Sequence, residues 1–158
     1  MRISTAIRFL AFFPLLAMLD VPPTERVVAN DNRTAAGVLS NGVLTIHLEA
    51  REGEWFPDAE TARGVVVRAF AERGKRLSAP GPMIRVTEGV TIDASVTNSL
   101  GEPLIMRGLA THNDIAMPDS TIIVPGETRE FHFAAGRAGT YYYHATTGTR
   151  PDLNAVDA

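Results

Sequence analysis

Apolar and polar residues alternate along most of the chain after residue 42, and a period of two is typical of β-strands. In residues 43–49, Leu44, Ile46 and Leu48 fall on one face, and the residues between them are polar. Eight segments either alternate in this way or form short apolar runs between turn residues: 43–49, 64–71, 83–86, 90–97, 104–109, 121–124, 128–133 and 140–145. No helical period follows the first thirty residues. The pattern predicts an all-β chain folded as a sandwich or a Greek-key barrel.

Turn residues separate these segments. Residues 51–63 and 110–120 are expected to be loops, because they are polar or rich in turn residues. The pair Pro125-Gly126 predicts a hairpin between the segments on either side of it.

The N-terminus has the pattern of an export signal. Arg2 and Arg8 precede an apolar run over residues 9–19. Three residues suited to a cleavage site follow, ending at Ala29. The apolar run is too short to span a membrane as a helix. The pattern predicts a signal peptide cleaved before Asn30, and therefore a periplasmic or extracellular protein.

Two charged residues leave an alternative open at this end of the chain. Glu25 and Arg26 lie between the apolar run and the predicted cleavage site, so a disordered or anchored N-terminus also fits. With cleavage, the expected organisation is a signal peptide over 1–29, an N-terminal extension over 30–42 and one domain over 43–158.

Composition excludes several classes of chemistry. The chain has no cysteine, which removes disulfides, cysteine zinc sites, thiol nucleophiles and a blue-copper centre within this chain. The formal net charge of −3 supplies no basic surface for nucleic acid. No nucleophile–base pair, phosphate loop or paired-carboxylate motif supports a hydrolase or a transferase.

Residues 139–146, with the sequence GTYYYHAT, carry the most informative pattern. Along a strand, alternate side chains share a face, so Tyr142, His144 and Thr146 are expected on one side. A histidine at 146 would place two imidazoles two residues apart, where both can bind one metal. Thr146 occupies that position instead.

Five motifs together resemble the first, plastocyanin-like (cupredoxin) domain of multicopper oxidases. In chain order they are PGPMIRVTEG at 80–89, VTN at 96–98, GL at 108–109, IVPG at 123–126 and GTYYYH at 139–144. The resemblance covers residues 40–150 and implies a cupredoxin-like Greek-key β-sandwich. Related domains continue into a further strand, so we expect this sandwich to lack its last strand.

The resemblance also implies copper, and one-electron substrate oxidation coupled to oxygen reduction. In these oxidases the first domain supplies two His-x-His pairs to a three-copper cluster. Here the first pair is replaced by Ile105 and Arg107, and the second is His144 followed by Thr146. One ligand position of four remains, and a guanidinium at 107 repels metal cations.

The candidate metal ligands are therefore His144 and His112, each with a plainer interpretation. His144 is either a remnant ligand or a hydrogen-bonded structural histidine. His112 is either a substitute ligand or a solvated loop residue. A charge cluster of Arg107 with Asp114 and Asp119 is a third interpretation. Copper binding by this chain alone is expected to be weak, tetragonal and without intense blue colour, or absent.

Two functions remain from the sequence. In the first, the chain is the N-terminal cupredoxin domain of a copper-binding oxidoreductase and is not catalytic on its own. Its partners are then further cupredoxin domains of the same protein or oligomer. In the second, it is a structural or interaction module that has lost copper binding. Neither requires nucleic acid or a membrane span.

Overall fold

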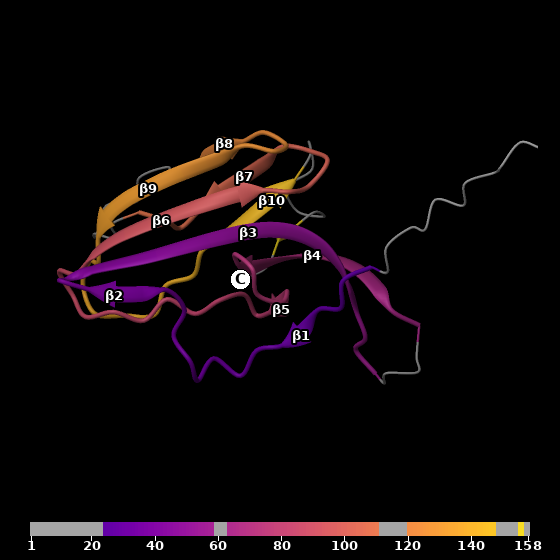
Figure 1. Cartoon of the computed structure of the whole chain (residues 1–158), viewed down its shortest axis with the longest axis horizontal. Coiled ribbons are helices and arrows are strands. Elements are labelled where there is room, and N and C mark those ends of the chain that lie inside the picture. Colours follow the sequence, from indigo (N-terminus) through magenta and orange to yellow (C-terminus); the bar gives the residue numbers. More distant parts are fainter. Residues whose placement is uncertain (1–23, 59–62, 111–119, 148–154, 157–158) are drawn as a thin grey trace, which may run out of the picture.

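The structure is a computed structural model that describes residues 24–58, 63–110, 120–147 and 155–156. Every regular element within these residues is a β-strand, and the strands form two sheets (Figure 1). The predicted all-β sandwich is therefore confirmed. Within the described part of the chain there is no helix long and apolar enough to cross a membrane.

Sheet A contains seven strands and is built around β3 (Val43–Trp55). The first half of β3 pairs in parallel with β6 (Thr91–Asn98), and its second half pairs antiparallel with β4 (Val65–Glu72). Figure 1 shows β3 running the length of this sheet. The remaining strands are β1 (Val28–Ala29), β2 (Val38–Ser40), β5 (Ser78–Ala79) and β9 (Thr128–Ala134).

Sheet B contains four antiparallel strands in the order β11-β10-β7-β8. Their bounds are β7 (Leu104–Arg107), β8 (Thr121–Ile123), β10 (His144–Thr147) and β11 (Ala155–Val156). The expectation that a last strand is missing stays a prediction.

The main core lies between the two sheets. The face predicted from residues 44, 46 and 48 is confirmed, because these three side chains are 3%, 1% and 0% exposed. From sheet B, Leu104 and Met106 enter the same cluster. Ile105 and Arg107, which alternate with them along β7, therefore point to the outer face of sheet B, because side chains alternate along a strand.

Two predicted local structures are wrong. Residues 51–55 were expected in a loop but extend β3, because their backbone pairs with residues 65–69 of β4. Residues 83–86 were expected as a strand but form none, although Ile84 and Val86 pack against the core. The preceding prolines, Pro80 and Pro82, have no N–H to donate to a strand ladder.

The predicted hairpin at Pro125-Gly126 is also wrong. β8 before this turn pairs with β7 in sheet B, whereas β9 after it pairs with β6 in sheet A. The chain therefore crosses between the sheets. The turn is held by Asn98, which is fully buried and whose Nδ2 donates to the carbonyls of Glu102 and Ile123, both at 2.9 Å.

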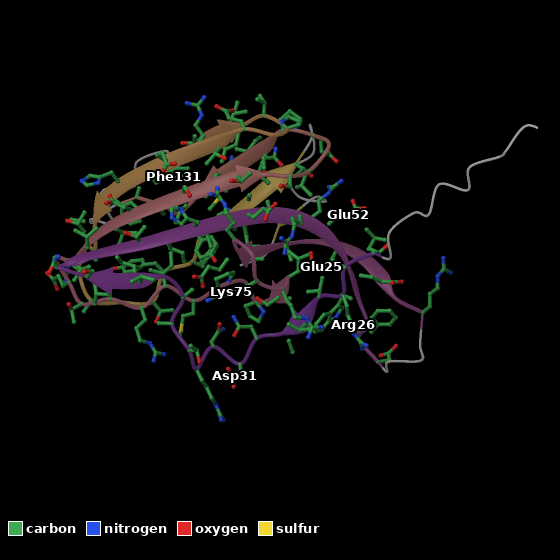
Figure 2. All side chains as sticks on the ribbon, in the orientation of Figure 1. Glu25, Arg26, Asp31, Glu52, Lys75 and Phe131 are labelled. Carbon is green, nitrogen blue, oxygen red and sulfur yellow. The ribbon has the colours of Figure 1, made fainter. Side chains whose placement is uncertain are left out.

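Residues 25–30, here called the N-terminal strap, form part of sheet A. Glu25 Oε1 accepts hydrogen bonds from Arg51 Nη2 at 3.0 Å and from the backbone N of Leu77 at 2.9 Å. Val27 is 2% exposed, and its backbone N donates to the Glu54 carbonyl. Figure 2 labels Glu25 and Arg26 on this strap.

The strap packs closely enough to require a glycine on β3. A Cβ added at Gly53 would lie 2.8 Å from both the Glu25 carbonyl oxygen and Val27 Cγ2. Cleavage before Asn30 stays a prediction, and it would remove these contacts.

We expect a chain that begins at Asn30 to unfold more easily than one that begins at Thr24. Loss of the buried Val27 side chain and of several hydrogen bonds should lower the free energy of unfolding by about 3 kcal/mol. Urea denaturation of the two chains measures the difference. Equal midpoints would show that the strap does not stabilise the fold.

Candidate metal centre

Strands β7 and β10 bring the four expected ligand positions together. In their antiparallel register His144 lies opposite Arg107, and Thr146 lies opposite Ile105. Leu104, Met106 and Ala145 are buried between the sheets, so the four positions share the outer face of sheet B. The predicted adjacency of the two ligand motifs is therefore present, and what differs is the side chains.

His144 is half-buried at the start of β10. Its ring lies 5.2 Å from the Tyr142 ring, measured between centroids, with the planes tilted by 36°. Nδ1 of His144 is buried and has no hydrogen-bond partner among the described residues. Nδ1 therefore gives no support to the interpretation of His144 as a hydrogen-bonded structural histidine.

Arg107 occupies the place of an expected imidazole. Its Nη1 lies 3.5 Å from Thr146 Oγ1, at the outer limit of a hydrogen bond. It forms no ion pair with any carboxylate in the described ranges. A half-buried, permanently charged guanidinium beside His144 raises the free energy of any cation placed there.

His112 lies outside the described residues, as do Asp114 and Asp119. The expectations that they act as a substitute ligand or as a charge cluster stay predictions. Two other histidines lie on the outer face of sheet A. His47 Nδ1 is 2.7 Å from Ser95 Oγ, and His132 pairs with Asp93. Both histidines are exposed, as expected for surface residues.

The described residues do not fit a copper centre. Nowhere in the described part of the chain do three His, Cys, Asp or Glu side chains converge as a metal site would require. On the outer face of sheet B, one imidazole stands beside an arginine, a threonine and an isoleucine. Tight copper binding needs several ligands in fixed geometry.

The position after β7 requires a glycine, Gly108. Its φ is +85°, and a Cβ at this position would lie 2.7 Å from Tyr143 Cα. The absence of a side chain lets β7 lie against the backbone that leads into β10. The predicted strand over 140–145 begins only at His144, and residues 141–143 lie outside the ladder with β7.

Tyr143 anchors that approach from inside the core. Its ring packs edge-on against Phe70 at 5.4 Å, and its hydroxyl donates to the Pro82 carbonyl at 2.7 Å. Burial raises the pKa of the Tyr143 phenol above its ordinary value. Tyr142 is 73% exposed and lies toward solvent. Tyr141 is 50% exposed as well, so of the three tyrosines only Tyr143 packs in the core.

A polar hollow between β3, β4 and residues 99–102 is lined by Glu52, Arg68 and Glu102. Arg68 pairs with Glu102 and donates to Thr147 Oγ1, so its charge is compensated. Ser99, which also lines it, donates its hydroxyl to Glu49, so among the described residues the hollow presents no free cation or hydroxyl. The sequence did not predict it, since Glu52 and Arg68 meet only when β3 pairs with β4, and residues 99–102 reach them from the end of β6.

The chain is similar in sequence to known proteins. Residues 76–156, which are 81 of the 158 residues, match the sequence model of a family described as multicopper oxidase. A multicopper oxidase of Mycobacterium tuberculosis is 39% identical over 77 residues, which cover 46% of this chain and 15% of that protein. An L-ascorbate oxidase of Nicotiana tabacum is 31% identical over 149 residues, which cover 89% of this chain and 22% of that protein.

A solved structure shares the fold. A laccase from Pediococcus acidilactici superposes with a TM-score of 0.53 at 14% identity, over 82% of this chain and 26% of that chain. The predicted cupredoxin-like β-sandwich is therefore confirmed. The chain spans about a fifth or less of the length of the curated relatives named above.

We expect Gly108→Ala to lower the free energy of unfolding by about 3 kcal/mol, because it adds both a left-handed backbone strain and a backbone contact. Gly74→Ala is the matched control, since Gly74 has a φ of +78° and nothing within 4 Å of an added Cβ. The control should lose about 1 kcal/mol. Equal losses, measured by chemical denaturation, would contradict the close approach of β7 and residues 142–143.

The buried phenol should make the protein sensitive to alkali. Above about pH 10 the unfolded chain releases the Tyr143 proton, whereas the folded chain retains it. The folded state then binds more protons, so the free energy of unfolding falls as pH rises. Denaturation series across this range should show a shallower fall for Tyr143→Phe than for the wild type, and no change for the exposed Tyr142→Phe. Identical slopes for wild type and Tyr143→Phe would refute this assignment.

Proposed function

Because the chain belongs to the multicopper oxidase family, we propose that it serves as an N-terminal-type cupredoxin domain that does not oxidise substrates on its own. The single observation that carries this proposal is the pairing of Arg107 with His144 on the outer face of sheet B. The strands that hold copper ligands in the resembling oxidases are retained. The ligands themselves are not, apart from one imidazole.

Catalysis by a larger assembly is compatible with this domain. The chain has no cysteine, so a blue-copper site must come from another polypeptide segment or subunit. The relatives are several times longer than the region that this chain matches. We infer that the partners are further cupredoxin domains of the same protein or oligomer, which supply the copper and the substrate site.

The second function, a structural or interaction module without copper, is favoured by the guanidinium of Arg107. This charge is fixed at every relevant pH and stands where an imidazole would be needed. Under this second proposal the sandwich contributes stability or contacts to its partners and no chemistry. Copper binding by the isolated chain separates the two functions.

We also infer export to the periplasm or the extracellular space. The support is the basic start and apolar run of residues 1–19. The N-terminal strap is stably paired in sheet A, so the mature protein retains most contacts if processing occurs upstream of Glu25. Sequencing the N-terminus of the exported protein tests both the export and the position of cleavage.

Copper titration tests the proposed function. We expect the purified chain to bind Cu(II) weakly, without intense blue colour, and to show no oxygen-dependent oxidation of phenols above that of free copper. If copper binds on the outer face of sheet B, His144→Ala should weaken it and change the electron paramagnetic resonance spectrum. His132→Ala, on sheet A, is the matched control.

Three outcomes are informative. Equal affinities and spectra in the wild type and His144→Ala favour the copper-free module. A loss confined to His144→Ala favours the copper-binding domain. Substrate oxidation by the copper-loaded chain alone would refute the proposal that it is not catalytic.

A further inference from the structure

The side chains that replace the copper ligands on the outer face of sheet B have the chemistry of an anion site. Arg107 supplies a planar set of N–H donors that matches the oxygens of a carboxylate or a phosphate. Thr146, directly beside it, supplies a hydroxyl. Neither group is a ligand for a metal cation in this setting, and both are common ligands for oxyanions.

Few hydrogen bonds of these side chains lie within the described part of the chain. Arg107 makes one hydrogen bond in the described part of the chain, at the long distance of 3.5 Å, and no ion pair there. Most of its donors have no partner among the described residues. A half-buried guanidinium without a carboxylate partner is uncommon, because charged groups removed from water are usually paired.

A second and independent observation lies on the opposite strand. Nδ1 of His144 is buried and has no partner among the described residues, although His144 is the cross-strand neighbour of Arg107. A buried polar atom without a partner is destabilising, and ligands or ordered water commonly satisfy such atoms. Among the described residues, Arg107 has one long hydrogen bond and Nδ1 of His144 has none, so two neighbouring side chains have unused polar atoms.

We propose that the outer face of sheet B carries a small-oxyanion site centred on Arg107, with Thr146 and His144 beside it. The ligand class is a carboxylate or a phosphate free in solution. Arg107 provides the charge and the paired donors, and Thr146 orients one oxygen of the ligand. The site replaces the cation chemistry of the family by anion chemistry on the same strands.

The site is tested on the full chain after passage over a chelating resin, so that no copper is present. Sodium phosphate and sodium acetate are titrated separately at constant ionic strength, with sodium chloride as the balancing salt. Backbone amide resonances of β7 and β10 are followed by ¹⁵N nuclear magnetic resonance in the wild type and in every variant, and the Nε–Hε resonance of Arg107 is followed wherever the arginine is present. We expect a saturable shift with at least one of the two probes and none with chloride.

Three variants locate the binding. Arg107→Gln should weaken it at least tenfold, because the charge is lost. Arg107→Lys should weaken it severalfold, because the charge remains but the planar donors do not. Arg85→Gln, which alters an exposed arginine beside Met83, should leave the affinity unchanged.

Thr146→Val gives a test that keeps the arginine and its charge, and it should weaken binding severalfold. No saturable shift in the wild type would overturn the proposal, as would equal affinities in the wild type and Arg107→Gln. The oxyanion site lies on the same face of sheet B as the copper position of the proposed function. Oxyanion binding therefore requires only that copper does not occupy that face. Because the protein is copper-free in this experiment, failure of oxyanion binding leaves the copper titration unaffected.

Discussion

β3 pairs with β6 along residues 43–47 and with β4 along residues 48–55, so its two halves belong to different ladders. This shared strand sets the positions of the other elements of sheet A. Its inward-facing residues form one side of the core. Near its C-terminal end, the N-terminal strap packs against it at Gly53. A one-residue slip of β3 would exchange its buried and exposed faces and would disrupt the core between the two sheets.

Sheet B depends on a second backbone constraint. β7 and the chain before β10 approach so closely at Gly108 that no side chain fits between them. This approach places His144 beside Arg107 and orders the outer face on which the proposed chemistry rests. The glycine is therefore a structural requirement of the strand pair, whatever side chains surround it.

The fold and a metal site place different requirements on this chain. Core packing, the buried Asn98 that links the sheets and the edge-on contact of Tyr143 with Phe70 require only shape and hydrogen bonds. A metal site requires several donors at once, and losing some of them leaves the sandwich intact. A domain can thus keep the architecture of an oxidase while the same strands present a guanidinium and a hydroxyl.

The sequence by itself determined the all-β class, the inward face of residues 44, 46 and 48 and the identity of the side chains at the positions that carry ligands in the resembling oxidases. These follow from local alternation and from motif spacing, which are properties of the chain alone. The tertiary structure decided which strands pair. Residues 51–55 extend β3 because β4 supplies a partner, and the Pro125-Gly126 turn joins two sheets because its flanking strands find different neighbours. The partnerless Nδ1 of His144 and the sparse bonding of Arg107 likewise depend on cross-strand register, which pairs residues far apart in sequence and is not encoded by any local pattern.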